Sequence, residues 1–189
     1  MLDLALRFLK NELNTYLLTQ TATNTVEVRL SKLVDESGRY AIDEETLGIT
    51  VINIEEDRIF KSHLPEYAYS NGQHLVMEPD LKLNLHILIA ANFKQYDQAL
   101  KYISLVLTFF QSHPFFDSSI NADLDPRIEK LVVELQSLNY EQLNQVWAFV
   151  GGKQLPSVIY KVRLVVLQDQ AQTAIQPPIT QINSTLQTR

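Results

Sequence analysis

The residues whose types suit metal chemistry gather in one short segment. His63, Glu66, His74 and Glu78 carry imidazole and carboxylate groups, and both groups are zinc ligands in proteins. The segment has no H-E-x-x-H pattern, and the chain has no cysteine that could supply a thiolate. We therefore expect these four residues to be ordinary loop and strand residues that hold no metal.

A second short motif resembles the end of a phosphate-binding loop. Gly151-Gly152-Lys153 has the glycine and lysine of that loop. However, Trp147 stands where its first glycine belongs, and Gln154 stands where its serine or threonine belongs. The sequence therefore favours a helix cap at Gly151 over a nucleotide site.

Ser112 and His113 form an adjacent pair with the groups of a hydrolase. No G-x-S-x-G turn surrounds them, and neighbouring residues on a helix point in different directions. We expect His113 to lie at the C-terminus of a helix. Altogether, we expect no enzyme: no catalytic residue, no cofactor and no bound metal.

Composition sets limits on the class of protein. The 189 residues are 46% hydrophobic and 20% charged, which is typical of a soluble globular chain. A net charge of −6 without a cluster of Lys and Arg argues against nucleic-acid binding. No apolar run is long enough to span a membrane, and the N-terminus lacks the pattern of a secretory signal. We expect one domain followed by a tail.

The elements that must carry any function are centred on residues 81–116. Apolar and polar residues alternate over residues 81–89, which is the period of a strand with one buried face. Over residues 96–110 the apolar residues recur every three or four positions, as on a helix. We expect Asn92 to cap this helix and Pro114 to end it.

This helix has more apolar surface than one sheet can cover. Tyr102, Leu105 and Phe109 widen its apolar face to about 220° of the circumference, whereas a surface helix needs only ~100°. A second partner must cover the rest. Two partners are compatible with the sequence: another helix of the same chain, or a neighbouring subunit.

The remaining elements follow the same periodicities. An N-terminal helix has an apolar face that Leu4 and Phe8 widen, and a later helix begins with an Asn139 and Gln142 capping box. The pattern predicts an α+β fold, a mainly antiparallel sheet with helices packed on it in the order α-β-β-β-α-β-α-β. The expected helices span residues 2–18, 96–113 and 139–150, and the expected strands span residues 26–31, 47–60, 81–91, 128–135 and 157–167.

Two segments fall outside this core. Asn71-Gly72 predicts a hairpin, with Tyr67 and Tyr69 on one of its strands. These tyrosines either fold back on the domain or bind a partner. We place the domain boundary after residue 169, because residues 170–189 are polar and form an extended arm, which is either disordered or docked on another surface. Its few apolar and stiff positions are Ile175, Pro177, Pro178, Ile179 and Ile182.

Several long segments in order resemble one family, the N-terminal-domain family of the cap, or tail terminator, of phage-tail-like contractile injection systems of the antifeeding-prophage and virulence-cassette kind. The resemblance covers nearly the whole chain and includes no catalytic motif. Some members of the family carry a further domain after this one. The segments are LDLALRFLKNELN, LGITVINIEEDRI, LKLNLHILIAANFKQYDQALKYISLVLTFFQSHPFF, DPRIEKLVVELQSLNYEQLNQVWAFVGGKQLPSVIYKVRLVVLQD and IQPPI.

The resemblance implies a tail-terminator-like fold and a structural role. Six copies would form a ring on the distal end of the inner tube, end the growth of tube and sheath, and link the two. It also implies that the protein is cytoplasmic during assembly of the particle and then remains a component of it. The assembled particle is either released from the cell or retained in it. The alternative is an adaptor or tail-completion module elsewhere in the same particle.

A ring needs two different patches that meet on neighbouring copies. Under this resemblance, the candidates for the subunit interface are Leu4, Phe8, Tyr102, Leu105 and Phe109. The candidates for contact with inner tube or sheath proteins are Tyr67, Tyr69, Ile175, Pro177, Pro178, Ile179 and Ile182. The arm would add backbone hydrogen bonds at an exposed sheet edge.

Overall fold

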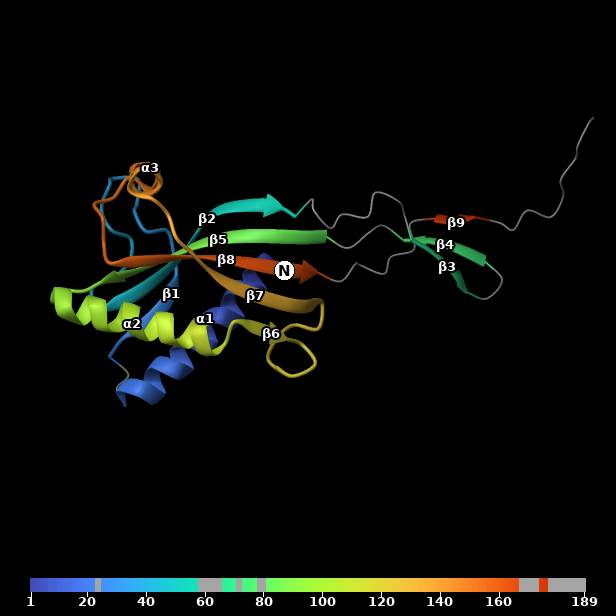
Figure 1. Ribbon diagram of the computed structural model, residues 1–189, viewed down its shortest axis with the longest axis horizontal. Coiled ribbons are helices and arrows are strands. Elements are labelled where there is room, and N and C mark those ends of the chain that lie inside the picture. Colours follow the sequence, from blue (N-terminus) through green and yellow to red (C-terminus); the bar gives the residue numbers. More distant parts are fainter. Residues whose placement is uncertain (23–24, 58–65, 71–72, 78–80, 167–173, 177–189) are drawn as a thin grey trace, which may run out of the picture.

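A six-stranded sheet in the order β1-β2-β5-β8-β7-β6 carries the other elements (Figure 1). The computed structural model describes residues 1–22, 25–57, 66–70, 73–77, 81–166 and 174–176. β1 runs parallel to β2, and every other neighbouring pair in this sheet is antiparallel. Its strands are β1 (Glu27–Leu30), β2 (Thr46–Glu56), β5 (Leu81–Asn92), β6 (Phe115–Asp117), β7 (Ile128–Gln136) and β8 (Ser157–Val166).

The helices lie on both faces of this sheet. α1 (Leu2–Thr21) and α2 (Tyr96–Ser112) cover one face, and α3 (Tyr140–Val150) covers part of the other (Figure 1). The expected α+β class and the expected order of elements are confirmed. The structure adds the three-residue strand β6, which is too short to leave a periodic signal. None of the described helices combines the length and the hydropathy that a membrane span requires.

The alternation of β5 explains why two helical layers are needed. Leu85, Ile87 and Ile89 are completely buried against α1 and α2. On the opposite face Leu88 and Ala90 are also completely buried, in a smaller core beneath α3. The second half of the strand is therefore covered on both sides, although the sequence pattern predicted one buried face.

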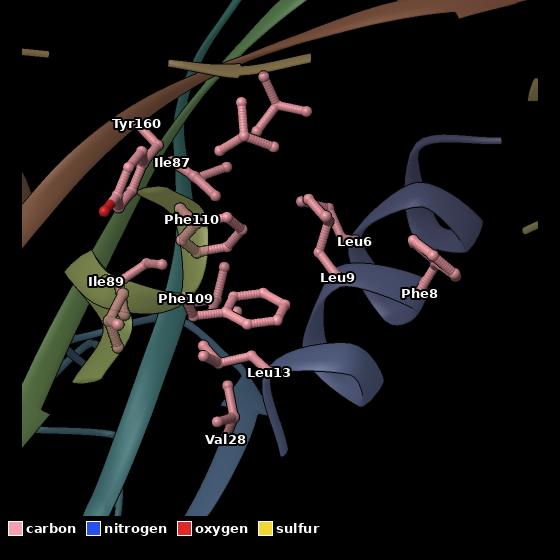
Figure 2. Close-up of a cluster of buried hydrophobic side chains, with 14 of the residues drawn as sticks. Leu6, Phe8, Leu9, Leu13, Val28, Ile87, Ile89, Phe109, Phe110 and Tyr160 are labelled. Atoms are coloured by element: carbon pink, nitrogen blue, oxygen red, sulfur yellow. The ribbon is translucent and has the colours of Figure 1, made fainter. Parts of the chain in front are cut away.

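α1 covers the surplus apolar surface of α2. Leu6, Leu9 and Leu13 of α1 project toward Phe109 and Phe110, whose far side meets the sheet (Figure 2). Of the two partners that the sequence allowed, the structure uses a helix of the same chain.

Both ends of α3 agree with the prediction from the sequence, and the start of α2 does not. Asn139 and Gln142 form the expected capping box at the start of α3, and Gly151, at a φ of 80°, ends it in the left-handed conformation. The predicted cap at Asn92 is wrong. β5 continues through this residue, whose side-chain amide donates to the carbonyl of Ile42 at 2.9 Å, and α2 begins instead after Gln95.

A second, three-stranded sheet lies beyond one end of the first (Figure 1). Its strands are β3 (Glu66–Ser70), β4 (Gln73–Met77) and β9 (Ala174–Gln176), in the order β3-β4-β9. Along the chain, β3 follows β2, β4 precedes β5 and β9 follows β8. The order β3-β4-β9 of the small sheet therefore repeats the order β2-β5-β8 of the large sheet. We call this extension the β-finger. Pro65 and Pro79 fall in two of the three connections, and proline cannot donate to a strand ladder.

Candidate assembly surfaces

Among the described residues, those with catalytic potential are not assembled into a site. His63 and Glu78 lie outside the described residues. Glu66 and His74 are on different strands of the β-finger, where Glu66 is paired with Met77 and His74 with Tyr69. No group of three or more potential metal ligands occurs among the described residues.

The other two motifs have structural roles. The Ser112 hydroxyl donates to the Thr108 carbonyl at 2.9 Å, and the His113 ring stacks on Phe109 with a centroid distance of 4.9 Å. Gly152 packs so closely that an added Cβ would lie 2.8 Å from a methyl group of Val34. The Gly151-Gly152 pair therefore ends a helix and allows close packing against a loop.

Three of the five predicted interface residues are buried inside the protomer. Phe8, Tyr102 and Phe109 are each at most 5% exposed. Their rings are held by the protomer's own aromatic residues: Phe8 meets Phe116 edge-on at 5.2 Å, and Tyr102 stacks on Phe93 at 5.0 Å. The rings fill the layer between α1, α2 and the sheet and present almost no surface to another subunit.

Leu4 and Leu105 are half-buried at the margin of the same core. Both leave part of their side chains at the surface. No contact with another subunit has been observed for either residue, so their place in an interface stays a prediction.

Sequence reasoning missed two exposed aromatic side chains on α3. Tyr140 is 93% exposed and Phe149 is 79% exposed, which is unusual for large aromatic side chains. A groove of about 360 Å³ lies between this helix and the sheet, where Val146 and Phe149 face Ile52 and Ile159. Aromatic residues with few charges are typical of protein interfaces. The signal in the sequence was YEQLNQVWAFV, in which Glu141 is the single charged residue.

Beyond α3 the same sheet face is polar. The Nε2 atom of His86 on β5 lies 3.3 Å from the carboxylate of Glu55 on β2, and Arg163 on β8 forms an ion pair with Glu134 on β7. Asn84, which is aligned with Arg163 across the strands, is only 6% exposed. These cross-strand pairs give the part of the sheet that α3 leaves uncovered a hydrophilic face.

A third surface belongs to the β-finger. The expected hairpin is confirmed, and Tyr67 and Tyr69 lie on β3. The register aligns Ala68, Leu75 and Ile175 in one cross-strand row, and consecutive rows lie on opposite faces of a sheet. Ile175 therefore lies in β9, paired with the chain's own hairpin. Pro177, Pro178, Ile179 and Ile182 lie outside the described residues, as does the expected domain boundary at 169.

The chain was compared with known proteins. Residues 5–181 match the Pvc16 N-terminal domain family. No curated protein sequence matches the chain.

Two solved structures share the fold over 94% of the chain. The PVC sheath/tube terminator of an extracellular contractile injection system, in its extended state, has a TM-score of 0.59 at 17% identity. The tube-terminating cap of the anti-feeding prophage has a TM-score of 0.60 at 18% identity. The chain covers 63% and 60% of the length of these two proteins.

Proposed function

The chain belongs to the Pvc16 N-terminal domain family, and on this basis we propose that it is a structural cap of a contractile injection system. In this role it binds the distal end of the inner tube, ends the growth of tube and sheath, and connects the two. The observation that carries the proposal is the fold, which is shared over 94% of the chain with a sheath/tube terminator and a tube-terminating cap.

Copies of the chain form a closed ring in this proposal, with six subunits as the expected number. Ring contacts are heterologous, so one surface of each copy meets a different surface of the next. The side of α3 that carries Phe149 supports one such contact, because this ring, which lines the groove beside the sheet, would be shielded from water there. Leu4 and Leu105 remain candidates for the facing surface. Phe8, Tyr102 and Phe109 support the ring only by fixing α1 on α2.

The β-finger is the proposed contact with the tube or the sheath. It extends away from the large sheet, and apolar residue types occupy both of its faces (Figure 1). Sheets with apolar residues on both faces are generally covered on both sides. Tyr67 and Tyr69 are the residues that we expect to contact the partner, since tyrosine suits interfaces that are partly wet.

Deleting the chain from particle-producing cells tests the proposal. We expect tubes and sheaths of irregular length with open distal ends in electron micrographs, and restored caps when the wild-type chain is supplied again. Particles of normal length with capped ends in the absence of the chain would refute the proposal.

A further inference from the structure

The outer edge of β7 is open over its second half. β6 pairs with β7 only from Lys130 to Val132. Beyond that, the Val133 N–H donates to the Pro114 carbonyl at 2.8 Å, but proline has no N–H to give back to the Val133 carbonyl. Because every second residue of a strand points its backbone groups to the same side, the N–H and C=O of Leu135 also face outward. Among the described residues, none pairs with these outward groups of Leu135.

An apolar groove lies directly beside this edge. Its volume is about 260 Å³, and Leu135 at its rim is 52% exposed. The Phe110 and Tyr160 rings form its wall, with centroids 4.7 Å apart. None of the residues that line it carries a charge: they are Leu107, Phe110, Gln111, Val133, Leu135 and Tyr160.

At the opposite edge of the sheet, one outward-facing residue of β1 already has partners for its backbone groups. There the side chain of Asn14 bonds both backbone groups of Val28 on β1. Of the two edges of the large sheet, the β7 edge thus has the backbone groups and the adjacent apolar space that an added strand needs.

We propose that this β7 edge binds residues 177–189 of a second copy of the chain, as an added strand. The segment follows β9, which lies in the β-finger away from the large sheet of its own copy (Figure 1). Its thirteen residues can span about 43 Å when extended, at ~3.3 Å per residue.

The composition of the segment matches the groove. Ile179, Ile182 and Leu186 provide apolar side chains, and Arg189 is its single charged residue. An uncharged strand suits an uncharged groove, because no ion has to lose its hydration. The inference rests on the proposed function, since the ring supplies the second copy. It assigns this segment to a neighbouring subunit of the ring, whereas the sequence analysis assigned it to tube or sheath proteins.

Disulfide trapping between two chains tests the contact. The natural chain has no cysteine, so Leu135→Cys in one chain and Ile182→Cys in a second, size-tagged chain form the only possible bridge between the two variants. A disulfide requires Cα atoms within about 7 Å, which is the spacing of paired strands. We expect a covalent heterodimer on oxidation. Tyr96→Cys, at a 67% exposed position at the start of α2, replaces Leu135→Cys in the control and should give none.

A second measurement keeps the test independent of cysteine geometry. Leu135→Pro removes the outward N–H, which the ladder to β8 does not use, and a proline is tolerated at such an edge position. This variant and a deletion of residues 177–189 should each lower the number of subunits in the assembled ring, and the double variant should lower it no further. Thermal unfolding verifies that each variant is folded.

Two results would overturn the inference. One is the absence of a heterodimer together with an unchanged ring after the deletion. The other is a deletion that abolishes binding to tube or sheath proteins while the ring keeps its number of subunits. That result would assign the segment to those partners. Both results leave the proposed cap function standing, because that function is tested by the ends of the particles.

Discussion

The side-chain amide of Asn14 on α1 occupies the edge of β1 at Val28. Asn14 Oδ1 accepts a hydrogen bond from the Val28 N–H at 2.8 Å, and Asn14 Nδ2 donates to the Val28 carbonyl at 3.4 Å. One side chain thus takes the place of a neighbouring strand. Edges with unpaired backbone groups invite uncontrolled pairing with other chains, and natural proteins commonly block them.

Asn14→Ala should destabilise the protomer, because the half-buried N–H of Val28 loses its acceptor. We expect a loss of about 1–3 kcal/mol in the free energy of unfolding, measured by urea denaturation. Asn11→Ala is the matched control, since Asn11 is an exposed asparagine on the same helix. Equal stabilities of the two variants would show that the bonds to Val28 contribute nothing.

Phe109→Ala should destabilise the protomer strongly. Phe109 is 2% exposed, and the centroid of its ring lies 5.1 Å from that of Tyr16 of α1 and 4.9 Å from that of Phe110. Loss of a buried phenylalanine ring typically costs about 3–5 kcal/mol. Leu100→Ala on the same helix is the control, because Leu100 is 45% exposed. A Phe109→Ala protein as stable as this control, but defective in ring formation, would return Phe109 to the interface.

Asn139→Ala should weaken the start of α3. Its side chain accepts a hydrogen bond from the Gln142 N–H at 2.8 Å, and the Gln142 side chain accepts one from the Asn139 N–H at 3.1 Å. Loss of such a cap costs about 1 kcal/mol. Hydrogen exchange of the first turn of α3 measures this effect, and unchanged protection there would contradict it. Asn144→Ala, within the same helix, is the control.

The protein should become less stable in alkali because of Tyr160. Burial raises the pKa of its phenol to about 12, from an ordinary value of 10. The folded protein therefore keeps a proton that the unfolded chain releases, so stability falls as the pH rises from 10 to 12, by up to roughly 2.7 kcal/mol. Unfolding measured against pH should show this loss in the wild type and a smaller one in Tyr160→Phe. Parallel pH profiles of the two proteins would rule Tyr160 out as the cause.

Replacing both tyrosines of β3, Tyr67→Ser with Tyr69→Ser, should weaken binding to tube or sheath proteins without unfolding the large sheet. The reason is that β3 belongs to the separate three-stranded sheet. Co-sedimentation with purified tubes and sheaths provides the measurement. Tyr96→Ser, which changes a 67% exposed tyrosine on α2, is the control. Binding equal to that of the wild type would remove the β-finger from the proposed contact.

The sequence predicted elements better than surfaces. Alternation and helical periodicity located β5 and α2 because these signals are local. The cap at Asn139 was predictable for the same reason. The burial of Phe109 was not, because it depends on α1 crossing over α2, and a periodic stripe does not reveal which other element covers it. The parallel pairing of β1 with β2 likewise leaves no local signal.

The surfaces that we propose for assembly could not be predicted for a related reason. Phe149 on α3 lies in an apolar run, so the sequence alone gave no means to separate it from buried Trp147 two residues earlier. The open edge at Leu135 depends on where β6 begins, and Pro114, just before this strand, prevents further pairing because it has no N–H. Such features require the tertiary arrangement.

The position of the chain in the intact particle tests the central claim most directly. Electron cryomicroscopy of complete particles should show density for the chain as a closed ring at the tube end distal to the baseplate, in contact with both tube and sheath. Density at the baseplate, or along the shaft as an adaptor, would contradict the account.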